Sequence, residues 1–287
     1  MSEIPPSNKQ TIENLIVTNS LSDIPKRFID PKQRANLLSG KDWLKNSISI
    51  WSNLSKTKEE KAFKHPASFP EALVEKLLLS FLSKPCLILD PFMGCGTTLA
   101  TAGKLNHQSV GFELYDEFTI KAKARVERYG SLCSIIQENA MNLSTYIKPE
   151  SIDMVITSPP YWNILRRQYS TNYKRARRLG YGENQNDLGN IQSYEEFLSR
   201  LMAILKEVYI ALKPKSYCII NVMDLRIKDR LYPLHSDLYT QLNTIGFKLD
   251  DLIIWDRRHD YNNFQTLGYP YKFRINRAHE YLLIFMK

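Results

Sequence analysis

The stretch Thr157-Ser-Pro-Pro-Tyr-Trp162 combines hydroxyl, proline and aromatic residues, and it directly follows a short apolar run at residues 154–156. The run is typical of a buried strand, and the two prolines prevent its hydrogen bonding from continuing. The first proline favours an extended backbone at Ser158, which presents a hydroxyl and a carbonyl in one direction. With an aromatic face beside them, these groups could hold the exocyclic amine of an extruded nucleobase. The competing interpretation is a proline-stopped strand followed by aromatic core residues.

A second candidate functional motif is the glycine loop Pro91-Phe-Met-Gly-Cys-Gly-Thr-Thr98, which lies between an apolar run and a helical pattern. Its glycines allow a ligand to approach the backbone closely, and Asp90 places a carboxylate just before it. Glu113 ends the next apolar run, 113 − 94 = 19 residues after the first glycine. A carboxylate at that position commonly accepts hydrogen bonds from ribose hydroxyls. The order strand, loop, helix, strand and glutamate therefore predicts a nucleoside-binding site.

The identity of the ligand follows from what the glycine loop lacks. Leu99 stands where dinucleotide-binding loops have a third glycine, and there is no Gly-Lys-Ser/Thr of a nucleotide-triphosphate loop. A nucleoside cofactor without a pyrophosphate remains, and S-adenosylmethionine fits. The alternative for Asp90 is a carboxylate that only stabilises the loop.

The helices and strands expected around these residues alternate regularly along the chain. Ser68 and Glu71 have capping-box spacing before an amphipathic helix that ends near residue 84. The pattern then predicts strands at residues 86–90, 109–113, 132–136, 152–156, 217–222, 249–255 and 281–286, and helices at residues 97–105, 116–129, 194–212 and 234–242. Such alternation predicts an α/β fold with a mostly parallel sheet and helices on both faces. Ligands bind such sheets at the carboxyl ends of the strands.

The composition of the 287 residues indicates a globular protein with a polyanionic partner. Apolar residues make up 43% and charged residues 24%, which is ordinary, but 39 Lys+Arg against 30 Asp+Glu give a net charge of +9. There is no apolar stretch of membrane-spanning length and the N-terminus is polar, so we expect a cytoplasmic protein of a prokaryote. The four cysteines, Cys86, Cys95, Cys133 and Cys218, lack the spacing of a metal site, so no metal is expected.

Two long connections and the N-terminal part stand outside the regular alternation. Near residues 163–192 and 256–276, arginines and lysines are interleaved with aromatic residues, which favours contact with nucleic acid over a solvated face. Residues 1–64 are polar and punctuated by prolines. We expect them to form an N-terminal extension, with a share in target recognition, beside a catalytic domain of residues 65–287.

Together these motifs resemble the amino-methyltransferases of DNA, the cytosine-N4 and adenine-N6 enzymes of modification systems. The resemblance covers residues 65–287 and extends to Asn276-Arg-Ala-His-Glu-Tyr-Leu-Leu-Ile-Phe-Met286, which is similar to the family's closing strand. It implies a Rossmann-like, seven-stranded class I methyltransferase sheet with a reversed last strand, S-adenosylmethionine as cofactor and double-stranded DNA as partner. A cognate restriction endonuclease is a further expected partner, while the oligomeric state is left open.

The resemblance also implies the roles of individual residues. Asp90 would lie near the methionine ammonium, Glu113 would hold the ribose and Asn139 would stand where the family often has an acidic contact to adenine. The expected cofactor residues are His65, Pro66, Phe69, Pro70, Asp90, Pro91, Phe92, Gly94, Cys95, Gly96, Thr97, Thr98, Glu113 and Asn139; the expected catalytic residues are Ser158, Pro159, Pro160 and Tyr161.

Three alternatives remain at this level. Ser-Pro-Pro-Tyr resembles the cytosine-N4 version of the catalytic motif, but adenine-N6 enzymes share it. RNA or tRNA guanine-N2 methyltransferases use a similar site, usually with Asp-Pro-Pro-Tyr and an added RNA-binding domain. A DNA-binding module with a vestigial cofactor fold is the non-enzymatic alternative. The order of the motifs, cofactor first and catalysis second, is permuted relative to many relatives with this cofactor motif.

Overall fold

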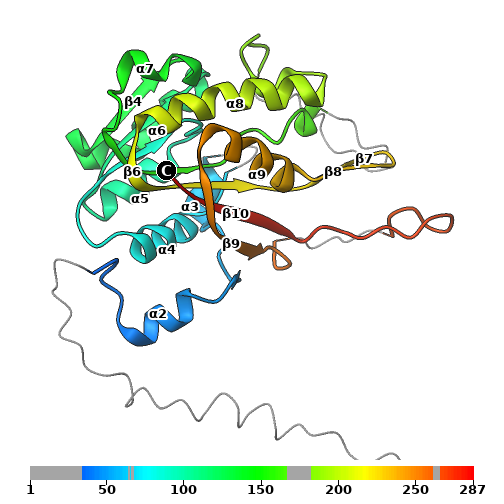
Figure 1. Ribbon diagram of the computed structural model, residues 1–287, viewed down its shortest axis with the longest axis horizontal. Helices are drawn as coiled ribbons and strands as arrows, with labels where there is room; N and C mark the ends of the chain where they lie inside the picture. The colour runs from blue at the N-terminus through cyan, green and yellow to red at the C-terminus, as the bar shows by residue number, and fades with distance from the viewer. Residues whose placement is uncertain (1–33, 64, 66–67, 167–181, 261–265) are drawn as a thin grey trace, which may run out of the picture. The chain divides into compact units, whose positions relative to one another are not determined.

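The computed structural model describes residues 34–63, 65, 68–166, 182–260 and 266–287, and Asn36–Lys287 form one compact unit. Its centre is a sheet in the strand order β1-β9-β10-β6-β5-β2-β3-β4. Figure 1 labels β4, β6, β9 and β10 of this sheet. The strands of this sheet are β1 (Ile50–Trp51), β2 (Leu87–Asp90), β3 (Gln108–Glu113), β4 (Cys133–Gln137), β5 (Ile152–Thr157), β6 (Leu212–Val222), β9 (Lys248–Asp256) and β10 (His279–Met286). A separate hairpin consists of β7 (Leu225–Ile227) and β8 (Arg230–Tyr232).

The last strand, β10, is the reversed one. It runs antiparallel to β6 on one side and to β9 on the other, while β2, β3, β4, β5 and β6 pair in parallel. The mostly parallel sheet with a reversed last strand is therefore confirmed. An eighth strand joins it: the two residues of β1 pair in parallel with the outer edge of β9.

Both faces of the sheet are buried, as the uninterrupted apolar runs predict. Alternate residues of a strand point to opposite faces, so Leu89 packs into one apolar core and Ile88 into the other. The first core is covered by α8 (Tyr194–Ala211) and α9 (Leu234–Ile245), and the second by α4 (Glu71–Phe81). The remaining helices are α2 (Gly40–Asn46), α3 (Lys58–Ala62), α5 (Thr97–Lys104), α6 (Asp116–Val126) and α7 (Leu143–Tyr146).

The chain reverses its direction of strand addition at β2. It adds β3 and β4 on one side of β2 and then crosses to add β5 on the other, with Ile88 opposite Met154 and Leu89 opposite Val155. The loops after β2 and β5 therefore diverge from adjacent carboxyl ends and leave a crevice between them. This reversal brings the glycine loop and the Ser-Pro-Pro-Tyr stretch to the same edge of the sheet.

The beginning of α4 differs from the predicted capping box. Pro70 is the residue before the helix and no side chain caps it. The backbone N–H of Glu71 instead donates to Glu60 Oε1, 2.6 Å away. The capping-box prediction is wrong because a carboxylate of α3, eleven residues earlier in the sequence, already satisfies this donor. Residues 36–63, expected as an appendage, thus belong to the same compact unit as the sheet.

A buried arginine ties α3, α4 and α6 to the glycine loop. Arg125 of α6 is 4% exposed, and its Nη2 lies 2.6 Å from Glu71 Oε1 and 3.9 Å from Glu60 Oε1. Its Nη1 donates to Thr97 Oγ1 at 2.9 Å, at the start of α5. Removal of the guanidinium would leave two carboxylates and a threonine hydroxyl without this partner in a water-poor region.

We predict that Arg125→Ala lowers the free energy of unfolding by about 3–5 kcal/mol, the usual cost of breaking a buried ion pair from one side. Chemical denaturation at constant pH measures this change. The matched control is Lys121→Ala on the same helix, whose pair with Glu117 is exposed and contributes less than about 1 kcal/mol. Equal stabilities of the two variants would show that the Arg125 group contributes no more than a surface pair.

Candidate active site

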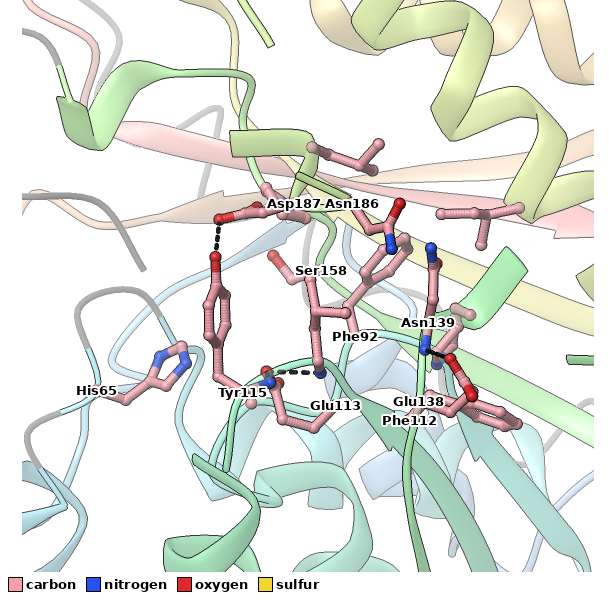
Figure 2. Close-up of a pocket in the computed structure, with 17 residues that line it drawn as sticks. His65, Phe92, Phe112, Glu113, Tyr115, Glu138, Asn139, Ser158, Asn186 and Asp187 are labelled. Carbon is pink, nitrogen blue, oxygen red and sulfur yellow. Dashed lines mark hydrogen bonds between the residues drawn. The ribbon is translucent and has the colours of Figure 1, made fainter. Parts of the chain in front are cut away.

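A pocket with about 620 Å³ of empty space, part of it open to solvent, lies at the carboxyl ends of β2, β3, β4 and β5 (Figure 2). Its walls come from seven segments of the chain, including both predicted motifs. The residues that line it are His65, Pro91, Phe92, Gly94, Phe112, Glu113, Leu114, Tyr115, Glu138, Asn139, Ala140, Ser158, Pro160, Asn186, Asp187, Leu188 and Ile204.

The glycine loop forms the floor of the pocket, and its shape requires glycine at two positions. Gly94 and Gly96 have φ angles of 53° and 77°, in the left-handed region. A Cβ atom on Gly94 would also lie only 2.7 Å from His65 Nε2. The missing side chain therefore leaves room for the His65 ring against the Gly94 backbone.

Asp90 is the buried anchor of this loop and does not line the pocket. Its Oδ2 accepts from Thr98 Oγ1 at 2.6 Å, and its Oδ1 accepts from Thr157 Oγ1 at 2.7 Å and from the Phe92 N–H at 3.1 Å. Burial raises the pKa of this carboxyl to about 6, although the three hydrogen bonds oppose the shift. This geometry matches the alternative interpretation of Asp90, a carboxylate that stabilises the loop.

Glu113 does reach the pocket, from the end of β3. Its Oε1 accepts from the N–H groups of Leu114 and Tyr115, both at 2.9 Å. Burial raises the pKa of Glu113 to about 7; the backbone donors oppose this shift and the neighbouring charge of Asp187 adds to it. A carboxylate so placed is an acceptor for ligand hydroxyls, and its acceptor strength depends on pH near neutrality.

The wall opposite the glycine loop comes from a segment that we expected to contact DNA. Asp187 is 5% exposed; its Oδ2 accepts from Tyr115 Oη at 2.8 Å, and its Oδ1 accepts from the Gly189 N–H at 2.7 Å. Figure 2 shows the Tyr115–Asp187 hydrogen bond along this wall. Residues 182–192 thus shape the pocket, whereas residues 167–181 of the same connection lie outside the described residues.

The far end of the pocket is formed after β4. Asn139 Oδ1 accepts from the Met141 N–H at 3.0 Å, and Glu138 Oε1 accepts from the Asn139 N–H at 2.6 Å. With Phe112 and Ile204, they make an apolar slot with polar groups on one side. A flat heterocycle fits such a slot.

The Ser-Pro-Pro-Tyr stretch approaches the pocket through Ser158 and Pro160. Ser158 Oγ lies 3.0 Å from Tyr161 Oη and donates within 3.2 Å of the Asn221 carbonyl. Trp162 is 4% exposed, donates to the Ile191 carbonyl at 2.8 Å and packs on Tyr194. The Trp162 ring therefore belongs to the core beneath α8, as the competing interpretation of aromatic core residues expects.

The predicted site residues divide into three groups. Those that line the pocket are His65, Pro91, Phe92, Gly94, Glu113, Asn139, Ser158 and Pro160. The described residues of the prediction that do not line it are Phe69, Pro70, Asp90, Cys95, Gly96, Thr97, Thr98, Pro159 and Tyr161. Phe69 lies in the apolar core with Leu73 and Val74, and Pro66 lies outside the described residues.

Sequence reasoning missed several residues of the pocket. Glu138 could have been predicted from the sequence, since it directly precedes Asn139 after a strand. No sequence feature identifies Asn186 and Asp187, because their approach to the pocket depends on the path of a long connection. Tyr115 was also missed, and its role becomes visible only through its partner Asp187.

The charges of the pocket favour a cationic ligand. Its lining includes three carboxylates, Glu113, Glu138 and Asp187, but no lysine or arginine among the described residues. Such a lining disfavours a pyrophosphate and suits a ligand with an ammonium or a sulfonium group. S-adenosylmethionine, which supplies an electrophilic methyl group on a positively charged sulfur, fits this charge.

The fold is of the class I methyltransferase type, and its pocket lies where such folds bind their ligands. The family model described as DNA methylase, of the N6/N4 type, matches residues 8–124 and 152–287. The chain belongs to this family. The predictions of the family, of the fold class and of S-adenosylmethionine as cofactor are confirmed.

Curated relatives match over shorter stretches. An orphan methyltransferase of Bacillus amyloliquefaciens, M.BamHII, is 40% identical over 86 residues, 29% of this chain and 32% of that protein. The type II methyltransferase M.BglII of Bacillus subtilis is 32% identical over 101 residues, 33% of this chain and 28% of that protein. The chain thus spans about a third of the length of the curated relatives that it matches.

Solved structures with a similar arrangement include TrmN from Thermus thermophilus, with a TM-score of 0.48 and 15% identity over 77% of this chain and 50% of that one. A putative DNA modification methylase of Thermus thermophilus, solved with S-adenosylmethionine, has a TM-score of 0.36 and 26% identity over 52% of each chain.

We predict that cofactor affinity rises with pH between about pH 6 and about pH 8, because ribose hydroxyls donate to the ionised form of Glu113. The raised pKa of Glu113, about 7, means that the ligand-free protein holds this proton until near neutrality and must lose it on binding. The same shift makes ligand-free stability fall as pH rises from about 4.5 through about 7, since the unfolded chain ionises first. Isothermal calorimetry checks the affinity.

The control is Glu113→Gln, which offers one carbonyl oxygen and no titration. Its affinity should be lower by roughly 5- to 100-fold above neutrality, equivalent to about 1–3 kcal/mol, and nearly independent of pH. A variant that keeps the parent affinity and the parent pH dependence would remove Glu113 from the binding site.

Proposed function

We propose that the protein transfers a methyl group from S-adenosylmethionine to the exocyclic N4 amine of a cytosine flipped out of double-stranded DNA. One observation carries the proposal. Ser158 of the catalytic stretch and Glu113 of the cofactor half line the same pocket, although they stand on different strands. A cofactor held by Glu113 and a base held at Ser158 would therefore meet in one crevice.

The chemical task at this crevice is to make a poor nucleophile react. The lone pair of an aromatic amine is delocalised into the ring, so the amine attacks only when its nitrogen becomes pyramidal. Acceptors placed out of the ring plane favour that geometry, and we assign this role to the Ser158 hydroxyl and the Pro159 carbonyl. As the nitrogen gains its methyl group, the bond between that methyl group and the sulfonium breaks, and one amine proton is lost to solvent.

Cytosine is preferred over adenine because the catalytic stretch begins with serine, as in the cytosine-N4 enzymes that it resembles. Adenine-N6 transfer is the alternative, since both bases present an amine beside a ring nitrogen. Guanine-N2 transfer to RNA is disfavoured by the serine, which stands where those enzymes usually have aspartate.

DNA contact is proposed for the arm that precedes β10, residues 266–277. Tyr269, Tyr271 and Phe273 alternate along it and are 78%, 94% and 93% exposed. Lys272 lies among them, and Arg274 forms an ion pair with Asp229 between β7 and β8. Exposed aromatic rings beside cations are suited to stacking on unpaired bases and to contacts with phosphates.

Nucleoside mass spectrometry of DNA from cells that express the protein tests the proposal. We expect 4-methylcytosine in the parent sample and roughly 10²–10³-fold less turnover with Ser158→Ala, the usual effect of losing one preorganised hydrogen-bond partner. Cofactor affinity and melting temperature should stay near the parent values, since the hydroxyl lies at the base side of the pocket. 6-Methyladenine instead would select the adenine alternative.

Two outcomes would contradict the proposal. Absence of any methylated base with the folded, cofactor-binding parent protein would contradict DNA methylation by the protein alone. A Ser158→Ala protein whose activity falls only in proportion to its unfolded fraction would show that Ser158 merely ends β5.

For the arm, we predict that Tyr271→Ala and Phe273→Ala each weaken DNA binding by about 1–3 kcal/mol, the usual contribution of one base–aromatic stack. Fluorescence anisotropy with a labelled duplex measures this, and unchanged melting temperatures are expected because both rings are exposed. The matched control is Tyr239→Ala, an exposed tyrosine on α9. Parent affinity in both arm variants would exclude these rings from the DNA contact.

A further inference from the structure

A connected group of polar side chains lies behind Ser158, on the side away from the pocket. Tyr161 Oη donates to Glu280 Oε2 at 2.7 Å, and Asn221 Nδ2 donates to the same oxygen at 2.6 Å and to Tyr161 Oη at 2.8 Å. Ser158 joins the group through Tyr161 Oη. These residues come from the loop after β5, from β6 and from β10, so the group spans three adjacent strands.

Glu280 fixes the direction of every hydrogen bond in this group. It is 3% exposed and forms an ion pair with Arg257, whose guanidinium lies 4.6 Å from the centre of the Trp255 ring. An ionised carboxylate only accepts hydrogen bonds. The Tyr161 hydroxyl therefore donates its single proton to Glu280. Asn221 likewise turns its amide N–H₂ towards the carboxylate.

The orientation of Asn221 supports this assignment. Its Oδ1 is buried without a hydrogen-bond partner among the described residues. Such an orphaned acceptor is costly. The opposite orientation would instead place this oxygen against the Glu280 carboxylate, and two acceptors at 2.6 Å repel each other. The carboxylate thus decides the orientation of the amide.

The orientation of these groups also fixes the direction of the hydrogen bonds of Ser158. Because Tyr161 gives its proton to Glu280, the hydrogen bond between the two hydroxyls must run from Ser158 to Tyr161. The other partner of Ser158 Oγ is the Asn221 carbonyl, which also accepts only. Both protein partners of Ser158 are therefore acceptors that share its single proton, and the serine presents its lone pairs to the pocket.

We propose that Glu280 is a positioning residue which, through Tyr161, holds Ser158 as a hydrogen-bond acceptor and thereby selects an amine over a carbonyl at the target base. The inference rests on the proposed function, since it concerns the same base. A cytosine presents N–H donors to Ser158, whereas a thymine or uracil presents an oxygen that would face its lone pairs. A site with a fixed acceptor excludes such an isostere far more strongly than a hydroxyl that is free to rotate.

The test uses Glu280→Gln, Tyr161→Phe and the double variant, with kcat and KM measured on unmethylated genomic DNA. Gln can donate as well as accept, so it releases the Tyr161 proton towards Ser158; Phe keeps the ring but removes the hydroxyl. We expect each single variant to lose roughly 10²-fold in kcat with cofactor affinity nearly unchanged. The double variant should lose little more than either single one, because both changes break one chain of hydrogen bonds.

The matched control is Glu196→Gln on α8, which removes the same charge from an exposed pair with Arg200 and should keep the parent kcat. A folded Glu280→Gln protein with the parent kcat, or losses that multiply in the double variant, would overturn the inference. If Glu280→Gln does not fold, Tyr161→Phe decides alone, since it leaves the Arg257–Glu280 pair in place.

A second measurement does not depend on activity. With tyrosine labelled with ¹³C at Cζ, the Tyr161 signal is assigned as the one that Tyr161→Phe removes. It should shift in Glu280→Gln and stay in place in Glu196→Gln. An unshifted signal overturns the chain of hydrogen bonds whatever the activity. A shifted signal in a parent protein that methylates no DNA supports the chain while the proposed function fails.

Discussion

The buried carboxylate of Asp90 is the contact on which the geometry of the site depends. It stands at the end of β2, where the sheet reverses its direction of growth, and binds Thr98 of the glycine loop's helix and Thr157 at the end of β5. Ser158 is the next residue after Thr157. One side chain therefore sets the distance between the backbone that cradles the cofactor and the hydroxyl that faces the base. Such a bridge positions both halves without touching a ligand.

The carboxylates around the crevice serve different purposes because their surroundings differ. Glu113 meets only backbone donors and a second carboxylate, so burial raises its pKa to about 7 and its charge responds to a ligand. Glu280 instead has Arg257 as a partner, and burial together with this carboxylate raises the pKa of Tyr161 well above its ordinary value. The first carboxylate can adjust to the cofactor, while the second keeps a fixed direction of hydrogen bonding behind the catalytic serine.

The sequence predicted the parts of the fold that depend on local pattern and left out those that depend on distant partners. The buried strands and the glycine loop could be predicted because apolar runs end at residues that cannot continue a strand or that require a positive φ. The capping of α4 could not, since Glu60 replaces the expected cap. Asp187 and Glu280 could not either, because each acquires its role from a tyrosine far away in the sequence.

The order of the motifs along the chain matters less to such a site than the order of the strands in the sheet. The crevice needs β2 beside β5, and this adjacency is the same whether the chain reaches the cofactor strand or the catalytic strand first. What the order does decide is which connections are free to lengthen. In this chain the long connections follow β5 and β9. The first lines the pocket with Asp187, and the second contains the aromatic arm that leads to β10. A permuted order can thus keep the chemistry and change the surfaces that meet the substrate.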